Sequence, residues 1–139
     1  MTTIQSKLRK PTVDDAPGIA ALINHFSDKG LLLPRPLNDV YERLRDFVVS
    51  EHEERLIGCA ALHVVWGGLA EIRSVAVAEE ARNSGVGRSL VENCLSRYEE
   101  LVMFLTGLGY GVKPIQVEDL KTPSDFDRCS HVYASMGAE

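Results

Sequence analysis

One short segment of the sequence combines residues suited to holding an anion: residues 82–89 read Arg-Asn-Ser-Gly-Val-Gly-Arg-Ser. A helix that begins here would leave its first N–H groups without partners, and its dipole would add partial positive charge. Gly85 and Gly87 carry no side chain that would keep a phosphate at a distance, and Arg82 and Arg88 add cationic charge. We therefore predict a pyrophosphate cradle at this turn. The simpler alternative is a surface turn that needs glycine only for its backbone angles.

The spacing within this segment excludes two well-known phosphate loops. The Walker pattern, Gly-x-x-x-x-Gly-Lys-Ser/Thr, requires a lysine, and none follows Gly87. The dinucleotide-binding fingerprint requires a third glycine, and that position is Leu90. What remains is Arg-x-x-Gly-x-Gly, formed by Arg82, Gly85 and Gly87.

This remaining pattern resembles the acyl-CoA pyrophosphate loop of the GNAT superfamily of N-acetyltransferases. Within that superfamily, the segment IGCAALHVVWGGLAEIRSVAV followed by RNSGVGRSLV resembles the short N-acetylglutamate synthase type. The resemblance implies an α+β fold, with a GNAT-like mixed, largely antiparallel sheet and helices on both faces. It also implies acetyl-CoA as cosubstrate and no metal. The predicted acetyl-CoA contacts are Val75, Ala76, Val77, Arg82, Asn83, Ser84, Gly85, Val86, Gly87, Arg88 and Ser89.

Two charged residues, Glu71 and Arg73, interrupt the apolar strand predicted over residues 69–77. Strand alternation places both on one face together with Val75 and Val77. Because an unpaired charge in a core is costly, either the two neutralise each other or reach the sheet edge, or this face borders a cleft. In the second case Glu71 would act as general base, directly or through water, as the GNAT resemblance implies. Arg73 would then pair with a carboxylate of the acceptor.

Arg35 lies between two prolines in the connection between the first two predicted helices. In the resembled family this connection lies over the acceptor pocket, which makes Arg35 a second candidate for binding the acceptor's carboxylate. A guanidinium can bind a carboxylate through two parallel hydrogen bonds. The alternative is a solvent-exposed arginine with no role in binding.

The resemblance predicts acetyl transfer from acetyl-CoA to the amine of a small amino acid, with glutamate as the expected acceptor. A glutamate base acting through water can deprotonate an α-amino group, whose reference pKa is near 8. Backbone N–H groups of the strand at residues 69–77 could polarise the thioester carbonyl. Two alternatives remain open. One is a protein or peptide N-acetyltransferase with an open groove, and the other is a protein that binds acetyl-CoA without transferring the acetyl group.

The elements that must position these residues follow from the apolar patterns. Thr12 followed by Asp15 indicates a capping box, and the apolar stripe after it predicts a helix over residues 13–26. Asn38 is a candidate cap for a second helix that carries Val40, Tyr41, Leu44 and Phe47. The predicted strands cover residues 8–11, 47–50, 56–66 and 69–77, with a hairpin at Gly67-Gly68.

The C-terminal part follows the family pattern less closely. A long helix is predicted over residues 85–100, and LVMFLT at 101–106 has the apolar, β-compatible character of a strand. Leu108-Gly109-Tyr110 follows almost at once, so either this strand merges with the preceding helix or a small helix of the family has been lost. Strand-forming residues continue at Val112, Ile115 and Val117, and residues 124–136 are expected to form a short helix.

Composition restricts the class of protein. The 139 residues suit one domain spanning 1–139, and the net charge of −5 argues against broad nucleic-acid binding. No apolar run approaches the ~20 residues of a membrane span, and the N-terminus lacks a signal peptide's apolar core, so a cytoplasmic location is expected.

Three widely spaced cysteines argue against a disulfide framework or zinc site, and Cys59 and Cys94 are expected in the core. The expected partners are a small-molecule amine acceptor and, as one option, a second copy in a homodimer, without nucleic acid or membrane.

Overall fold

A five-stranded sheet forms the centre of the chain, of which the computed structural model describes residues 4–66, 69–107 and 131–135. The strands lie in the order β1 (Lys7–Arg9), β2 (Phe47–His52), β3 (Arg55–Trp66), β4 (Leu69–Val77) and β5 (His131–Ser135). Each of these neighbouring pairs is antiparallel. The predicted α+β fold with a largely antiparallel sheet is confirmed.

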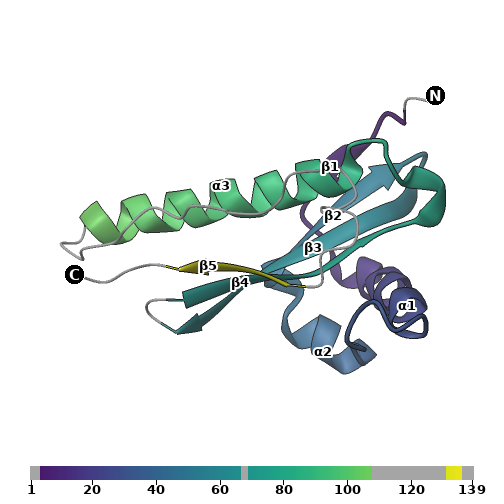
Figure 1. Cartoon of the computed structure of the whole chain (residues 1–139), viewed down its shortest axis with the longest axis horizontal. Coiled ribbons are helices and arrows are strands. Elements are labelled where there is room, and N and C mark those ends of the chain that lie inside the picture. Colours follow the sequence, from purple (N-terminus) through teal and green to yellow (C-terminus); the bar gives the residue numbers. More distant parts are fainter. Residues whose placement is uncertain (1–3, 67–68, 108–130, 136–139) are drawn as a thin grey trace.

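Helices cover both faces of this sheet (Figure 1). α3 (Val86–Gly107) lies along one face, and α1 (Ala16–Ser27) and α2 (Leu37–Glu42) lie on the other. Two apolar cores result, because each face buries its own set of side chains. The core under α3 includes Val48, Ile72, Val75, Val77, Leu90, Val91 and Tyr98, and the core under α1 includes Ile19, Ile23, Phe26, Val40, Val49, Cys59 and Ala76. None of the described helices is long and apolar enough to cross a membrane.

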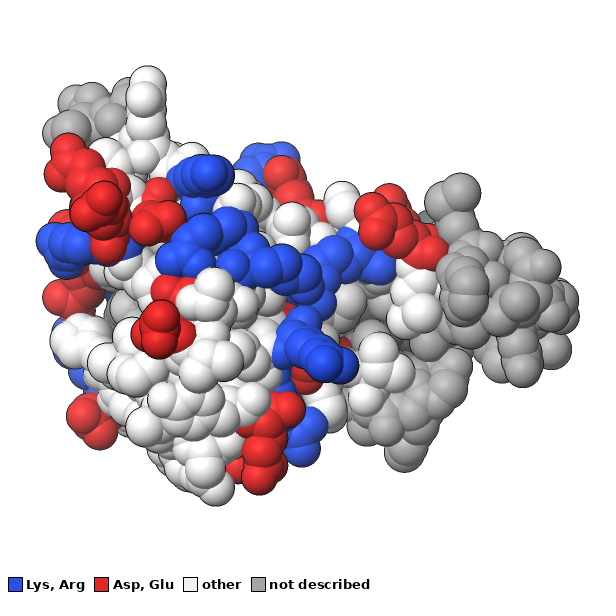
Figure 2. Space-filling view, turned by 180° about the vertical axis from the view of Figure 1, so that it is seen from behind, with Lys and Arg blue, Asp and Glu red and all other residues white. Residues whose placement is uncertain are grey.

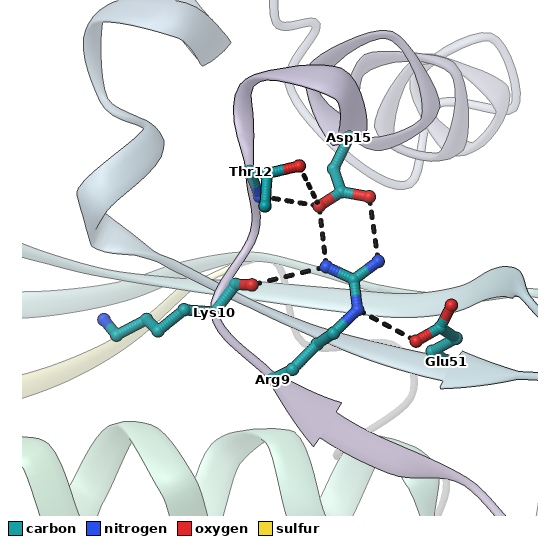
Figure 3. A network of polar contacts seen from close by, with 5 residues as sticks. All are labelled: Arg9, Lys10, Thr12, Asp15 and Glu51. Atoms are coloured by element: carbon teal, nitrogen blue, oxygen red, sulfur yellow. Dashed lines mark hydrogen bonds and ion pairs between the residues drawn. The ribbon is translucent and has the colours of Figure 1, made fainter.

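Arg9 joins three elements at the β1 edge of the sheet (Figure 3). Its guanidinium binds both carboxylate oxygens of Asp15, at 2.7 Å from Nη1 and 2.9 Å from Nη2, and its Nε donates to Glu51 of β2 at 2.9 Å. Asp15 also accepts the N–H of Thr12 at 2.7 Å, which confirms the predicted capping box. The next residues form a 3-10 turn, η1 (Val13–Asp15), so that α1 begins only at Ala16. The network fixes the start of α1 against β1 and β2.

This network predicts a measurable pH dependence of stability. The Arg9 guanidinium lowers the pKa of the Asp15 carboxyl to about 2. A carboxyl with a lowered folded-state pKa contributes stability that is present above its unfolded value, about 4, and is lost as the pH falls through its folded value. We expect the free energy of unfolding to fall more steeply between about pH 4 and pH 2 in the wild type than in Asp15→Asn. Urea unfolding at several pH values checks this, and parallel curves would contradict it.

The second helix is shorter than predicted. α2 ends at Glu42, because Arg43 leaves helical geometry with φ −111° and ψ 20°. A 3-10 turn, η2 (Leu44–Asp46), then leads directly into β2 at Phe47. Phe47 and Val49 pack in the core under α1, while Val48 packs in the core under α3. The alternation of a strand buried on both faces therefore overrides the helical spacing that placed Leu44 and Phe47 on one stripe.

The facial pattern predicted for β4 is wrong after Arg73. Ser74 has a positive φ of 56°, and the register passes from Ala61↔Arg73 to Cys59↔Ala76, so β4 contains one extra residue. This β-bulge reverses the alternation. Val75 and Val77 consequently pack under α3, and Ala76 packs in the core under α1, on the face of Glu71 and Arg73.

The C-terminal elements also differ from the predictions. α3 continues to Gly107, so the segment 101–106 is helical and the alternative in which it merges with the preceding helix is correct. Residues 131–135, expected within a short helix, form β5 and pair with β4 from Leu69 to Arg73. The sequence His-Val-Tyr-Ala-Ser contains the β-branched and aromatic residues that favour a strand. The strand residues expected at Val112, Ile115 and Val117 lie outside the described residues.

Candidate functional site

The predicted cradle lies where a 3-10 turn, η3 (Glu79–Ala81), passes into α3. Asn83 and Gly85 have positive φ values of 60° and 88°, and a Cβ added to Gly85 would meet no atom within 4 Å. The N–H of Ser89 donates to the Gly85 carbonyl at 3.0 Å, which begins the hydrogen-bond ladder of α3. The N-terminal end of a long helix therefore lies beside open space, which is the arrangement that an anion site requires.

Close packing against β3 fixes where α3 begins. A Cβ added to Gly58 would lie 2.8 Å from Leu90 Cδ1 and 3.0 Å from Val86 Cγ1, so glycine at this position allows the first turn of α3 to rest on the strand. Two hydroxyls stabilise the same turn: Ser84 donates to the Ala81 carbonyl, and Ser89 donates to the Val86 carbonyl at 2.9 Å. The backbone of the cradle is thus held by the protein itself.

Arg82 is the arginine of the cradle that fits an anion best. Its guanidinium carbon lies 5.5 Å from the ring centroid of Phe26, so that the side chain is supported by α1. Its Nε is buried and has no hydrogen-bond partner among the described residues. A buried donor without an acceptor costs free energy, and a phosphate oxygen would supply the acceptor. Arg88, by contrast, is exposed and pairs with Glu92 at 2.9 Å.

The bulge in β4 separates residues that pair with strands on both sides from residues that pair only with β3 within the described part of the chain. β5 pairs with β4 at residues 69–73, and its described pairing stops at His131. Ala76 and Val77 pair with Cys59 and Gly58 of β3 on the other side. The side chains of Val75, Ala76 and Val77 are at most 1% exposed, so that only their backbone groups are candidates for contact with a ligand. An extended ligand arm could add to this edge as a further strand would.

Three arginines surround a small hollow between α2 and the sheet, which we call the arginine hollow. Arg35, Arg43 and Arg73 line it, together with Asp39, Val40, Asp46, Phe47 and Ala61. None of the three arginines forms an ion pair with a described residue. Burial lowers the pKa of Arg73, and the nearby charge of Arg35 lowers it further, while Glu71 acts in the opposite direction. Three positive and two negative side chains therefore line the hollow, which leaves an excess of positive charge.

Hydrogen bonds hold both the backbone and the side chain of Arg35 beside this hollow. The side chain of Asn24 on α1 accepts the Arg35 N–H at 3.0 Å and donates to its carbonyl at 3.0 Å. The Nε of Arg35 donates to the hydroxyl of Ser74 at 3.4 Å. Arg35 is only partly exposed and so differs from the solvent-exposed residue of the alternative interpretation. The β4 bulge and the proline-rich connection thus bring Arg35 and Arg73 to one place.

Glu71 lies in the middle of the sheet and is 9% exposed. Its strand is flanked by β3 on one side and β5 on the other, with His63 and Tyr133 as its register partners. The alternative that Glu71 reaches the sheet edge is therefore wrong. Glu71 shares a face with Arg73, which lines the arginine hollow. The candidate base and the candidate carboxylate-binding residues consequently lie on the same side of the sheet.

The structure adds three polar residues that sequence reasoning missed. His63 on β3 forms a hydrogen bond through Nδ1 to Asp46 Oδ2 at 2.9 Å, and Arg43 Nη1 lies 3.2 Å from His63 Nε2. The predicted hairpin at Gly67-Gly68 gave no signal for His63, because a two-residue loop there pairs Val64 with Glu71, and only the register shift between Val64 and Trp66 brings His63 opposite Glu71. Arg43 and Asp46 gave no signal either, because the predicted second helix extended through both.

The described cysteines are core residues, as expected. Cys59 and Cys94 are buried, and burial raises the pKa of their thiols to about 12 and about 11. Thiols in this state are poor nucleophiles. Cys129 lies outside the described residues. Within the described part of the chain, no group of three or more His, Cys, Asp or Glu residues is arranged to hold a metal ion.

Comparisons with known proteins identify the family and the fold. Residues 20–109 match the model of the acetyltransferase (GNAT) family. The chain is 38% identical over 92 residues to an uncharacterized N-acetyltransferase of Chlorobaculum tepidum, covering 66% of this chain and 59% of that protein. It is 35% identical over 97 residues to the amino-acid acetyltransferase of Mycobacterium tuberculosis, covering 68% and 55% of the two chains. The chain therefore spans little more than half the length of these relatives.

A solved structure shares the fold. The N-acetylglutamate synthase of Neisseria gonorrhoeae, crystallised with coenzyme A and N-acetyl-glutamate, has a TM-score of 0.68 and 23% sequence identity. The similarity covers 95% of this chain and 35% of that one. It confirms the predicted GNAT-like arrangement of sheet and helices.

Proposed function

Because the chain belongs to the acetyltransferase (GNAT) family, we propose that it transfers an acetyl group from acetyl-CoA to the amine of a small amino acid, with glutamate as the preferred acceptor. The observation that carries the choice of acceptor is the arginine hollow, where Arg35, Arg43 and Arg73 lie without ion pairs to described residues. Glutamate has two carboxylates for such a site and one amine to be acetylated. Relatives named amino-acid acetyltransferase support the same class of acceptor.

In this proposal, residues 82–89 bind the diphosphate of acetyl-CoA. The unpaired Nε of Arg82 and the open space beside Gly85 support this assignment. The backbone of Val75, Ala76 and Val77 holds the pantetheine arm, since their side chains are buried and β5 does not pair with them within the described residues. The thioester then lies beside the bulge in β4, on the side where Glu71 and Arg73 face the acceptor.

The reaction begins with deprotonation of the acceptor's ammonium group. Glu71 takes this proton, directly or through water, because only the free amine has the lone pair needed for attack. The nitrogen then bonds to the thioester carbonyl carbon, and backbone N–H groups of β4 stabilise the oxyanion that forms. When the carbon–sulfur bond breaks, the nitrogen has lost a second proton and the thiolate of CoA has gained one. The products are the N-acetyl amino acid, CoA and one proton released to solvent.

An acceptor comparison tests the proposal. Release of the CoA thiol from acetyl-CoA is measured with L-glutamate, L-glutamine and an N-terminally unblocked peptide as acceptors. We expect glutamate to give the highest kcat/KM, because glutamine lacks the second carboxylate. Preference for the peptide would favour the protein N-acetyltransferase alternative. Tight CoA binding without turnover of any amine would favour the non-catalytic alternative.

Variants of the two predicted carboxylate-binding arginines refine this test. Arg35→Gln and Arg73→Gln should each raise the KM for glutamate by about 10-fold to 100-fold, since a charge-assisted hydrogen bond contributes about 1.5–3 kcal/mol. Arg55→Gln is a matched control, because Arg55 is exposed and pairs with Glu80 away from the hollow. If the KM for glutamate is unchanged in both variants, neither arginine binds the acceptor.

A further inference from the structure

His63 lies directly opposite Glu71 in the register of β3 and β4. Residues opposite each other in an antiparallel pair have neighbouring side chains on one face, so His63 extends the polar surface that contains Glu71 and Arg73. We propose that His63 is a second proton acceptor for the acetyl transfer, and that Asp46 is the positioning residue that orients its ring. This inference rests on the function proposed above.

The hydrogen bonds of His63 define its tautomer. An ionised Asp46 can only accept, so the Nδ1 atom of His63, 2.9 Å from Asp46 Oδ2, must carry the proton of this bond. In the neutral ring Nε2 then carries a lone pair. Arg43 Nη1 lies 3.3 Å from Nδ1 and 3.2 Å from Nε2, so the guanidinium lies over the ring face and leaves the in-plane lone pair of Nε2 open. The network therefore presents a neutral imidazole with its basic nitrogen directed away from Asp46.

The η2 turn that carries Asp46 is held by hydrogen bonds from α3 and from Lys10, which follows β1. Arg97 on α3 donates from Nη1 to the Asp46 carbonyl at 3.0 Å and from Nη2 to the Arg45 carbonyl at 3.2 Å. The Nζ of Lys10 donates to the same Arg45 carbonyl at 3.4 Å. Lys and Arg side chains gather in a band on the face seen in Figure 2. These bonds hold η2 in place, and with it the carboxylate that orients His63.

The charged groups around His63 suit a ring that gains and loses a proton. Arg43 and Asp46 face it from the connection between α2 and β2, and Glu71 and Arg73 face it from β4. Asp46 and Glu71 stabilise the imidazolium, while Arg43 and Arg73 oppose it. The Arg43 side chain is exposed and lines the arginine hollow, so a bound carboxylate can draw its guanidinium away from the ring of His63.

The proton balance of the reaction requires a second proton acceptor, and we assign this role to His63. The acceptor nitrogen loses two protons in each cycle, one before attack and one after its bond to the carbonyl carbon has formed. Glu71 takes the first proton. His63 Nε2 takes the second as the carbon–sulfur bond breaks, and the resulting imidazolium is stabilised by Asp46. One of the two protons passes to the departing thiolate and the other to solvent, so that both residues return to their starting states.

The test compares wild type with His63→Asn, whose amide can keep the hydrogen bond to Asp46 but cannot accept a proton. We expect kcat with glutamate to fall about 100-fold, while the KM for glutamate changes less than about threefold. The wild-type kcat should decline at acidic pH, where an imidazole base is protonated and cannot accept a proton, and this decline should disappear in His63→Asn. Asp46→Asn should lower kcat and move the decline to lower pH, and Asp46→Glu should partly restore both.

Each outcome has a defined meaning. Melting temperature and CoA affinity should be unchanged in His63→Asn, which separates loss of the base from loss of the fold. A wild-type kcat in His63→Asn, or a reduced kcat that keeps the wild-type pH profile, would overturn the inference and leave the proposed function intact. Wild-type protein that binds CoA but acetylates no amine would instead overturn the proposed function, and this inference with it.

Discussion

Replacing Glu71 with glutamine is expected to lower kcat with glutamate by about 100-fold to 10,000-fold, the range over which a general base contributes. Glutamine has nearly the same shape, so the 9% exposed side chain should still fit between β3 and β5. It cannot accept a proton from the ammonium group. The KM for glutamate should change little, since the arginine hollow remains. Steady-state kinetics at saturating acetyl-CoA provide the measurement.

The dependence of this loss on pH distinguishes a base from a structural residue. As the pH rises toward the pKa of the acceptor amine, more amine is already deprotonated, so the deficit of Glu71→Gln should shrink. Glu99→Gln serves as a control, because Glu99 is an exposed glutamate on α3. A wild-type rate in Glu71→Gln would remove Glu71 as the base.

The second large effect is expected at the turn before α3. Arg82→Ala combined with Gly85→Val should weaken CoA binding at least about 100-fold, as measured by isothermal titration calorimetry. Loss of the Arg82 guanidinium removes a charge-assisted hydrogen bond of about 1.5–3 kcal/mol. A valine at Gly85 would fill the space in which no protein atom now lies within 4 Å of a Cβ. Unchanged affinity would mean that CoA binds elsewhere.

Gly30 offers a matched control for the glycine. Its φ is +73°, close to the +88° of Gly85, and a Cβ added there also meets no atom within 4 Å. A valine at either position therefore suffers similar backbone strain. Gly30→Val should lose stability as Gly85→Val does but keep its affinity for CoA. Equal losses of affinity in the two variants would attribute the effect to strain rather than to a blocked site.

The turn and helix start of the proposed cradle could be predicted from sequence because their signals are local. Glycine and arginine spacing, an apolar strand before it and an amphipathic helix after it all lie within residues 69–102. The structure places η3, the two positive-φ residues and the start of α3 within that same segment. Local backbone chemistry therefore indicated this turn, while packing against Gly58 of β3 fixes where α3 begins.

The faces of β4 could not be predicted in the same way. Strand alternation assumes one residue per position, and nothing about the serine at position 74 indicates a left-handed backbone at φ 56°. The bulge becomes visible only in the pairing of β4 with β3. It moved Val75 and Val77 to the α3 face while leaving Glu71 and Arg73 on the face where alternation had put them.

Local propensity decided one C-terminal element, the end of α3, and tertiary pairing decided the other, β5. Residues 101–106 contain no glycine or proline, so the α3 helix can continue to Gly107 despite the β-compatible composition of that segment. β5 is specified by its antiparallel neighbour β4, which lies more than fifty residues earlier in the chain. Arg43, Asp46 and His63 likewise meet only because η2 and β3 come together in the folded chain. Such long-range contacts leave no spacing that a single sequence reveals.

A crystal structure with CoA and glutamate tests the central claim most directly. The account predicts the diphosphate within hydrogen-bond distance of the N–H groups that open α3 and of Arg82 Nε, and the sulfur beside the β4 bulge. It places the amine of glutamate toward Glu71 and its carboxylates among Arg35, Arg43 and Arg73. CoA bound in another crevice, or glutamate outside the arginine hollow, would contradict it.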